Sequence, residues 1–465
     1  MLRKRSRAGS SWRIHHGWTS STRPPEIDGN SRIDLTSLDG VLSVDEKSRE
    51  AEVESNLPMR QLLEATLEHD LIPPVVMEFP SITVGGGISG GAGESSSWKH
   101  GLFHRTCREL EVVLACGDTV RASPVENPEL FRGIPGSCGT LGIVTAARLR
   151  LIPASSYVAL TYVRVEGFQQ LVDRIRDTCF GSGNSAVEFV DAIMYDPDLG
   201  VVMLGSLTDS PGFPRRRFRR ARDEWIYIHA CDVVRNHSTY TEYVPIRDYV
   251  FRYDRGAFWA GRYAFTVTGV PFRRASRFIF DPFLDTDSLY TALHSSKLSH
   301  RYLVQDICLP SDSVAPFLEW VDRRIGIRPM WLWPIRPDRD SPFSPAAIET
   351  DLVIDVGLWG IPRGGFLAAN REIERKTVEL EGRKMLYAHV YHPAEEFAAT
   401  YNCQQYRSLR RKYGADRAFP SLYEKVRTDG SVKANMSVAA GAGAVFRRTL
   451  TGLAKPLRRL LLRRR

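Results

Sequence analysis

The chain has 465 residues, of which 43% are hydrophobic and 25% are charged. This length is too great for one hydrophobic core, so we expect two domains, and the composition excludes a disordered, collagen-like or coiled-coil protein. The formal net charge of +9 comes from the residues after Asp429, which include nine basic and no acidic side chains. Residues 1–429 are neutral as a block, so the charge does not predict a nucleic-acid-binding face.

Cysteine spacing and hydropathy argue against several further classes of protein. The seven cysteines are scattered, and no two have the C-x-x-C spacing of zinc or thioredoxin-type sites. We therefore expect reduced thiols, no metal site and a cytoplasmic location. No apolar run approaches the ~20 residues that span a bilayer, and residues 1–20 lack the apolar core of a secretory signal.

The first third of the chain predicts a strand-rich domain. Residues 1–30 are rich in Arg, Ser, Gly and Pro and are typical of a loop. Pro58 opens a predicted helix, and the Gly117-Asp118 turn predicts an antiparallel hairpin. In chain order we expect strands at 40–45 and 50–54, a helix at 58–69, and strands at 109–114, 119–122 and 139–151.

After Pro153 the sequence predicts a second lobe in which strands alternate with helices. The arginine-rich segment 215–220 interrupts it and is expected to be a solvated surface stretch. The predicted strands are 157–165, 187–195, 201–207, 302–309, 351–359 and 384–391, and the predicted helices are 168–179, 314–325, 371–381 and 394–413.

A glycine-rich segment at 83–96 contains six glycines within nine residues. It satisfies G-x-G-x-x-G after the strand-like residues 82–84, which formally suggests a Rossmann fold. That fold needs a long apolar helix next, whereas here more glycine, a serine run and an antiparallel hairpin follow. We instead expect a backbone that approaches a ligand closely and offers N–H groups to anionic oxygens; a flexible loop is the alternative.

Two other segments have possible ligand chemistry. Residues 15–23 combine Gly17 with four hydroxyl side chains, which suits phosphate binding, although a disordered N-terminus explains the same composition. Residues 135–145 place Gly139 and Gly142 at the entrance of an apolar strand, which by itself indicates only a tight turn.

Together the three segments resemble the flavin domain of the vanillyl-alcohol-oxidase superfamily and, more closely, the Δ24-sterol reductase family. The likeness covers roughly residues 12–427. Its motifs are His16-Gly-x-x-x-Ser, Ser81-Ile-Thr-Val-Gly-Gly, Glu94-Ser-Ser-Ser97, Gly101-Leu-Phe103, Ser137-Cys-Gly-Thr-Leu-Gly142, Ile152-Pro-Ala154, Tyr243-Val-Pro-Ile-Arg247, Val304-Gln-Asp306, Ile354-Asp-Val-Gly357, Met385-Leu-Tyr-Ala388 and Ala418-Phe-Pro420.

The resemblance implies an α+β fold in two parts. A PCMH-type FAD-binding domain of two α+β subdomains is expected over residues 1–155. A cap domain with a mostly antiparallel sheet is expected over 156–430, with its C-terminal part either in the cap or returning to the FAD domain, and a basic tail over 431–465. The implied activity is reduction of a C=C bond of a sterol or other lipid-like substrate by NADPH through FAD.

The resemblance also assigns the cofactor contacts. Residues 83–96 should contact the pyrophosphate and ribityl groups, residues 16–21 the phosphates, and residues 139–143 the adenine side. The implied FAD-binding residues are His16, Gly17, Ser20, Ser21, Thr83, Val84, Gly85, Gly86, Gly87, Ile88, Ser89, Gly90, Gly91, Ala92, Gly93, Glu94, Ser95, Ser96, Cys138, Gly139, Gly142 and Ile143.

Reduction of an isolated double bond also needs a proton donor near the flavin ring. The candidates are Glu94, Lys99, Asp306, Tyr387 and His389, and each of them also has an ordinary structural interpretation. His100 and His104 are candidates for covalent attachment of the flavin, but the resemblance implies non-covalent FAD.

The chain departs from the family pattern in two places. Only residues 1–15 precede the phosphate loop, where family members have a membrane-anchoring helix and further strands. Either the gene start is misplaced or the first strands are absent, which would weaken FAD retention. Residues 447–465 pair leucines with arginines, which is typical of peripheral membrane contact, although a disordered basic tail is the alternative.

Three functions therefore stay open on the sequence. The first is the FAD-dependent reductase of a lipid-like alkene. The second keeps the fold but acts as an oxidase or dehydrogenase of an alcohol or a sugar-lipid. The third is a flavin-domain remnant that binds partners or a membrane without turnover. The sequence predicts no nucleic-acid partner and leaves the oligomeric state open.

Overall fold

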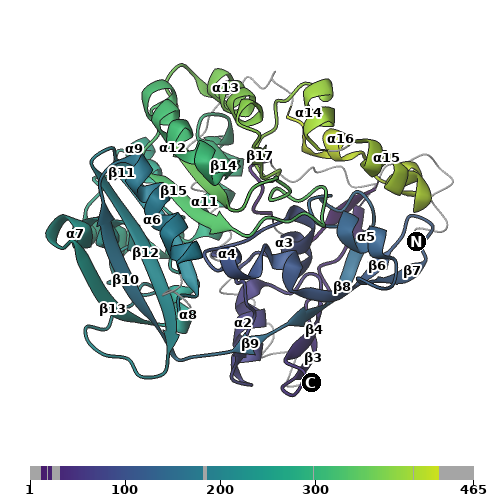
Figure 1. The fold of residues 1–465 in the computed structure, drawn as a ribbon, viewed down its shortest axis with the longest axis horizontal. Coiled ribbons are helices and arrows are strands. Elements are labelled where there is room, and N and C mark those ends of the chain that lie inside the picture. The colour runs from purple at the N-terminus through teal and green to yellow at the C-terminus, as the bar shows by residue number, and fades with distance from the viewer. Residues whose placement is uncertain are drawn as a thin grey trace.

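A computed structural model of the protein describes residues 12–17, 19–23, 32–181, 186–296, 298–401 and 403–428. Within these ranges the chain has the predicted α+β architecture, built on a five-stranded and an eight-stranded sheet (Figure 1). The smaller sheet belongs to the N-terminal third of the chain, and the larger sheet to the part after Pro153.

The five-stranded sheet has the order β3-β4-β8-β6-β7 and is antiparallel throughout. Ala51 and Val53 are fully buried while the alternating Glu50, Glu52 and Glu54 are not, so one face of β4 packs on the core. The strands are β3 (Val41–Asp45), β4 (Glu50–Glu54), β6 (Cys107–Val113), β7 (Thr119–Ala122) and β8 (Ile143–Arg150). The predicted strands and the hairpin are confirmed.

Short elements surround this sheet. Strand β1 lies within the N-terminal region predicted to be a loop, and it pairs in parallel with β2. The predicted helix after Pro58 is α2. The bounds are β1 (Arg13–His15), β2 (Arg32–Asp34), β5 (Leu71–Ile72), β9 (Ile152–Pro153), α2 (Met59–Leu67), α4 (Ser97–His100) and α5 (Pro128–Gly133).

The glycine segment differs from the prediction, because residues 84–90 form helix α3 (Val84–Gly90) rather than the end of a strand and a loop. The Thr83 hydroxyl accepts a hydrogen bond from the Gly86 N–H at 3.2 Å and so caps the helix. Gly91 ends it with a φ of +69°, a conformation that suits glycine. The N-cap and the C-terminal glycine offset the poor helix propensity of the glycines between them.

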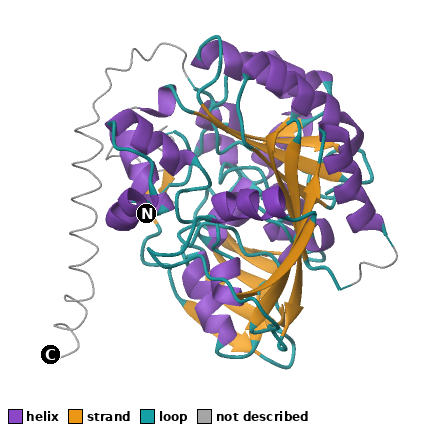
Figure 2. Cartoon of the chain, turned by 90° about the vertical axis from the view of Figure 1, so that its left-hand side faces the viewer, coloured by secondary structure: helices purple, strands orange, loops and turns teal. Residues whose placement is uncertain are grey.

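The eight-stranded sheet has the order β13-β10-β12-β11-β15-β16-β14-β17, and all its pairings are antiparallel. Helices lie along its outer side (Figures 1 and 2). The strands are β10 (Tyr157–Val165), β11 (Phe189–Asp196), β12 (Leu199–Thr208), β13 (Thr239–Pro245), β14 (Leu303–Pro310), β15 (Met330–Ile335), β16 (Val353–Gly360) and β17 (Arg383–Lys384).

Both faces of β14, β15 and β16 are buried, and alternation along each strand decides which residue faces which side. On β14, Leu303, Ile307 and Leu309 pack in a core beneath the outer helices. Val304 and Asp306 instead face a cavity on the inner side. The outer helices are α6 (Phe168–Phe180), α12 (Ser311–Trp320), which continues as a π-helical turn to Ile325, and α13 (Phe366–Glu379).

Two predicted elements of this lobe are wrong in part. Of the expected strand 384–391, only Lys384 lies in a strand, β17, which pairs with β14. The expected helix 394–413 is divided into α14 (Ala394–Thr400) and α15 (Cys403–Lys412). The sequence also missed α7 (Ile226–Asn236), α8 (Ile246–Tyr249), α9 (Ala260–Thr268), α10 (Arg274–Phe280) and α11 (Thr286–Ser295).

The C-terminal described segment returns to the N-terminal third of the chain. Arg410 donates from Nη1 to the Thr140 carbonyl at 2.8 Å, and the Trp12 N–H donates to the Ala418 carbonyl at 2.6 Å. Helix α16 (Leu422–Val426) follows, and its Lys425 donates to the Cys138 carbonyl. Within the described ranges no helix is both long and apolar enough to cross a bilayer.

Candidate active site

A cavity of about 870 Å³ lies between the glycine segment, the inner face of the large sheet and the C-terminal segment. All three segments that the sequence singled out contribute to its lining. His16, Gly17, Ser20 and Ser21 come from the first, and Cys138 and Gly139 from the third. A concave site of this size suits a cofactor-sized ligand.

One face of helix α3 and the turn after it forms what we call the glycine wall: Gly85, Gly86, Ser89, Gly90 and Gly93. These positions recur with helical spacing. A Cβ built at Gly90 meets nothing within 4 Å, so this part of the wall is open to the cavity. Thr83 and Ala92 also line the cavity.

The opposite face of α3 packs into the protein. Val84 and Ile88 are fully buried in the core, and a Cβ at Gly87 would lie 2.4 Å from the Met77 Cε. Other predicted FAD-binding residues also lie away from the cavity lining, namely Gly91, Glu94, Ser95, Ser96, Gly142 and Ile143. Because residues 84–90 form a helix and not the expected loop, only the residues on one face of this helix can contact a ligand in the cavity.

Basic side chains border the phosphate loop. Arg23 donates to the Leu386 carbonyl at 2.7 Å and also to the Ala388 carbonyl, which ties the loop to the chain after β17. Burial lowers the pKa of His16 to about 4, and the positive charge of Lys425 adds to that effect. The basic residues that line the cavity are Arg13, His15, His16, Arg23, Arg32, His294, Lys425 and Arg427.

The residues present fit an FAD. The buried Ser55 Oγ, Asn56 Oδ1 and His16 Nδ1 lack hydrogen-bond partners among the described residues, and all three residues line the cavity. A ligand with hydroxyl and phosphate groups would satisfy them. The basic residues supply the charge that a pyrophosphate requires, and the open glycine wall supplies room for close approach.

The inner face of the large sheet contributes aromatic rings and a carboxyl group, which we call the cap wall: Asp306, Trp331, Trp333 and Trp359. The Trp331 ring lies 5.6 Å from that of Trp333 and 5.8 Å from that of Trp359. Gly357 lies opposite Asp306 in the sheet, and a Cβ there would be 2.6 Å from the Trp359 ring. This wall is an apolar surface with one titratable group.

Asp306 and Tyr387 are the two predicted proton-donor candidates that the structure brings together in the cavity. The Tyr387 hydroxyl donates to Asp306 Oδ2 at 2.8 Å. Burial raises the pKa of Asp306 to about 7, against the opposing effect of this hydrogen bond. Near neutral pH the carboxyl group is therefore partly protonated and suited to acid chemistry.

Glu78 is a second cavity carboxyl group, and the sequence analysis missed it. Burial raises the pKa of Glu78 to about 8, and nearby Glu94 and Asp306 also raise it. The available signal was a lone carboxylate inside the apolar run from Val75 to Phe79.

Glu94 lies outside the cavity lining, in a buried ionic network between the glycine segment and the large sheet. Arg252 donates to Glu94 Oε1 at 2.8 Å and to Asp191 Oδ2 at 3.0 Å. Asp191 also accepts hydrogen bonds from Tyr253 and, at 3.1 Å, from the Trp331 indole. In this geometry Glu94 positions the cap wall rather than facing the cavity.

Lys99 and the two histidines considered for covalent attachment also lie outside the cavity lining. Lys99 Nζ lies 2.7 Å from Glu188, and its side chain is 38% exposed. His100 contacts the same glutamate, and His104 Nε2 lies 2.5 Å from Asp338. All three side chains are held by carboxylates.

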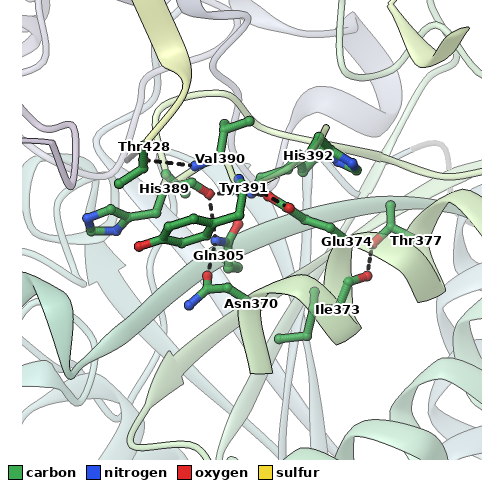
Figure 3. A network of polar contacts seen from close by, with 12 residues as sticks. Gln305, Asn370, Ile373, Glu374, Thr377, His389, Val390, Tyr391, His392 and Thr428 are labelled. Atoms are coloured by element: carbon green, nitrogen blue, oxygen red, sulfur yellow. Dashed lines mark hydrogen bonds and ion pairs between the residues drawn. The ribbon is translucent and has the colours of Figure 1, made fainter. Parts of the chain in front are cut away.

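His389 belongs to a structural polar network (Figure 3). Its carbonyl accepts hydrogen bonds from Gln305 at 3.0 Å and from Lys384. Its ring stacks on Tyr391, and burial holds the pKa of the imidazole far below its usual value. The ring therefore stays neutral and is not part of the cavity lining.

Comparison with known proteins is consistent with this geometry. A family model described as "FAD binding domain" matches residues 3–123. The Δ24-sterol reductases of Macaca fascicularis and Homo sapiens are each 32% identical over 418 residues, which is 88% of this chain and 80% of theirs. The chain belongs to the Δ24-sterol reductase family.

The relationship extends to plants. The Δ24-sterol reductase of Arabidopsis thaliana is 30% identical over 430 residues, covering 84% of this chain and 76% of its own. Cytokinin dehydrogenase 5 of the same plant matches only 108 residues at 36% identity, or 23% of this chain. Members of the Δ24-sterol reductase family act on a carbon–carbon double bond, and this chain is an FAD-dependent oxidoreductase of that class.

Proposed function

We propose that the protein reduces a C=C bond of a sterol or other lipid-like substrate with electrons from NADPH, through non-covalently bound FAD. The observation that carries the proposal is the Asp306–Tyr387 pair, which shares one cavity with the glycine wall and the phosphate loop. The reductase names of the relatives support the substrate class.

The chain's own groups divide the work of holding the cofactor. His16, Ser20, Ser21 and the basic residues around them would hold the phosphates, and the glycine wall would lie against the ribityl chain. When bound, FAD supplies the reducing equivalents that side chains cannot. The carboxylate partners of His100 and His104 support non-covalent binding.

Asp306 is the proposed proton donor to the second carbon of the double bond. Its Oδ2 accepts the Tyr387 hydroxyl hydrogen, which leaves Oδ1 to carry and deliver the acidic proton. Among the described residues Oδ1 has no hydrogen-bond partner. Tyr387 is a positioning residue, because its hydrogen bond fixes the direction of the carboxyl group.

The cap wall excludes water from the reacting atoms and orients an apolar substrate. Trp331 is held in place by its hydrogen bond to Asp191, and through it by the Arg252 network. Aromatic rings in this position offer a rigid apolar surface without competing polar groups. Such a surface favours a sterol-like ring system over a sugar.

The spectrum of the purified protein tests this proposal. We expect bound flavin, bleached anaerobically by NADPH and restored by a sterol with a Δ24 double bond. Bleaching by alcohols but not by NADPH would support the oxidase alternative. Absence of flavin together with failure to take up added FAD would reject both the reductase and the oxidase function.

We also propose that the enzyme is cytoplasmic and contacts a membrane surface through the basic tail 447–465, which lies outside the described residues. Its combination of leucines and arginines supports contact with anionic lipid. Deletion of residues 444–465 should reduce binding to anionic liposomes, and unchanged binding would reject this role for the tail.

A further inference from the structure

A second surface, separate from the tail, carries exposed apolar side chains. Phe278, Ile279 and Phe280 follow one another on α10 and are 55%, 66% and 39% exposed. The first two project from the protein, whereas the Phe280 ring lies 6.3 Å from that of Phe265 beneath it. Three consecutive large apolar residues in such positions mark an interaction surface.

The surroundings of this patch are strongly basic. Arg273 and Arg274 lie at the start of α10, and Arg274 donates to the carbonyl of Arg222, two residues after the arginine-rich segment 215–220, at 3.4 Å. In the described part of the chain, no carboxylate forms an ion pair with the exposed guanidinium groups of Arg219, Arg220, Arg222, Arg273 and Arg274.

Of the nearby carboxylates, Asp281 and Glu224 are engaged by buried arginines, whereas Asp223 accepts a hydrogen bond from the Arg220 backbone N–H at 2.8 Å. Asp281 pairs with Arg255 at 2.6 Å, and Glu224 pairs with Arg277 at 2.5 Å. No acidic residue occurs between positions 260 and 280. The surface therefore combines apolar side chains with uncompensated positive charge, which complements an anionic lipid interface rather than an apolar protein groove.

The helices that flank α10 in the chain line the cavity. Helices α9 and α11, which precede and follow α10, contribute Tyr263, Ala264, Leu289 and Leu293 to the cavity lining. A lipid that leaves a bilayer at α10 would meet these apolar side chains before it reaches the cap wall.

We propose that α10 and residues 219–222 dock the protein on an anionic bilayer. Phe278 and Ile279 enter the interfacial region, and the five arginines contact lipid phosphates and carboxylates. The surface delivers the lipid substrate to the α9–α11 side of the cavity; this delivery role rests on the proposed function, whereas docking itself does not.

The test uses the full-length chain and vesicles of neutral phosphatidylcholine, with and without anionic phosphatidylserine. Hydrogen exchange should slow in residues 271–283 when anionic vesicles are added, a local readout that binding by the tail would not produce. The double variant Phe278→Ser/Ile279→Ser should bind vesicles about tenfold more weakly. The matched control Phe180→Ser/Ile361→Ser removes residues of similar exposure elsewhere and should bind like the wild type.

A charge variant separates lipid from protein partners. Arg219→Ser/Arg220→Ser/Arg222→Ser should lose at least about tenfold in affinity for anionic vesicles and little for neutral ones. Unchanged exchange in residues 271–283 on vesicle binding would overturn the proposal, as would equal binding by the Phe278→Ser/Ile279→Ser variant. Protection of these residues by self-association, without vesicles, would assign the surface to a second copy of the chain instead. None of these readouts requires turnover, so failure of the proposed activity is distinguishable from failure of docking.

Discussion

The glycine wall and the cap wall face the same cavity but are built on opposite principles. The glycine wall removes side chains, so that backbone and open space meet the ligand. The cap wall places indole rings and one carboxyl group on a rigid, fully paired sheet. Under the proposed function, cofactor binding and proton delivery are carried by different elements, so mutation should separate them.

The largest expected effect is on the cap wall. Asp306→Asn should lower kcat by about 10²–10⁴-fold, because it removes the proton donor while leaving the FAD contacts intact. Asp355→Asn is a matched control, since Asp355 is a buried carboxyl group on the neighbouring strand β16, on the same face of the sheet but outside the cavity lining. Steady-state turnover at saturating FAD measures both. Equal kcat values for Asp306→Asn and the wild type would contradict a role of the cap wall in proton donation.

The ionic network between the walls should affect stability and not chemistry. Glu94→Gln weakens a charged hydrogen bond to buried Arg252, so we expect a loss of about 1.5–3 kcal/mol in the free energy of unfolding. Lys99→Met, at a half-exposed ion pair, should cost less than about 1 kcal/mol. Urea unfolding with FAD present measures both. If Glu94→Gln instead abolished turnover in a stable, flavin-loaded protein, the carboxylate would belong to the reaction.

A side chain added to the glycine wall should weaken FAD binding. Gly90→Leu adds a side chain where a Cβ meets nothing in the protein, so the apoprotein should keep its stability. The new side chain occupies cofactor space, and an overpacking cost of about 1–3 kcal/mol raises the Kd for FAD about tenfold to a hundredfold. Flavin fluorescence titration gives the Kd, and thermal unfolding of the apoprotein is the control. Unaltered FAD binding would place the cofactor elsewhere.

The pH dependence should report on the cap wall alone. Asp306 acts as an acid only when protonated, so kcat should fall about tenfold per pH unit above its pKa of about 7. Because the pKa of Asp306 is higher in the folded protein than in the unfolded chain, protonation of this carboxyl group stabilises the fold. This contribution to the free energy of unfolding is fully present below about pH 4 and is lost as the pH rises through about 7. Glu78→Gln should keep the fall near pH 7, whereas Asp306→Asn should lose it. A fall that moves with Glu78→Gln would make Glu78 the donor.

Most strands were predictable because their signals are local. Strand β10 and the hairpin of β6 and β7 combine β-branched residues with clear turns, and the structure reproduces them. Helix α3 was missed because helix propensity weighs heavily against glycine, whereas its formation depends on a Thr83 cap and on contacts with Ser55 that are distant in sequence.

The site was predictable only where a motif marked it. Asp306 and Tyr387 lie in family-like motifs, but their hydrogen bond spans 81 positions and no spacing rule predicts it. Glu94 and His389 have side chains that can donate a proton, and only their partners in the fold reveal that they lie outside the cavity lining. The sequence therefore predicted which segments line the cavity better than it predicted which side chains point into it.

The two half-reactions, followed separately by anaerobic stopped-flow absorbance, test the central claim most directly. The account predicts that wild type and Asp306→Asn bind FAD and are reduced by NADPH at similar rates. It also predicts that reoxidation by a Δ24 sterol is about 10²–10⁴-fold slower in Asp306→Asn. Equal reoxidation rates in the two proteins, or slowing of reduction instead, would contradict it.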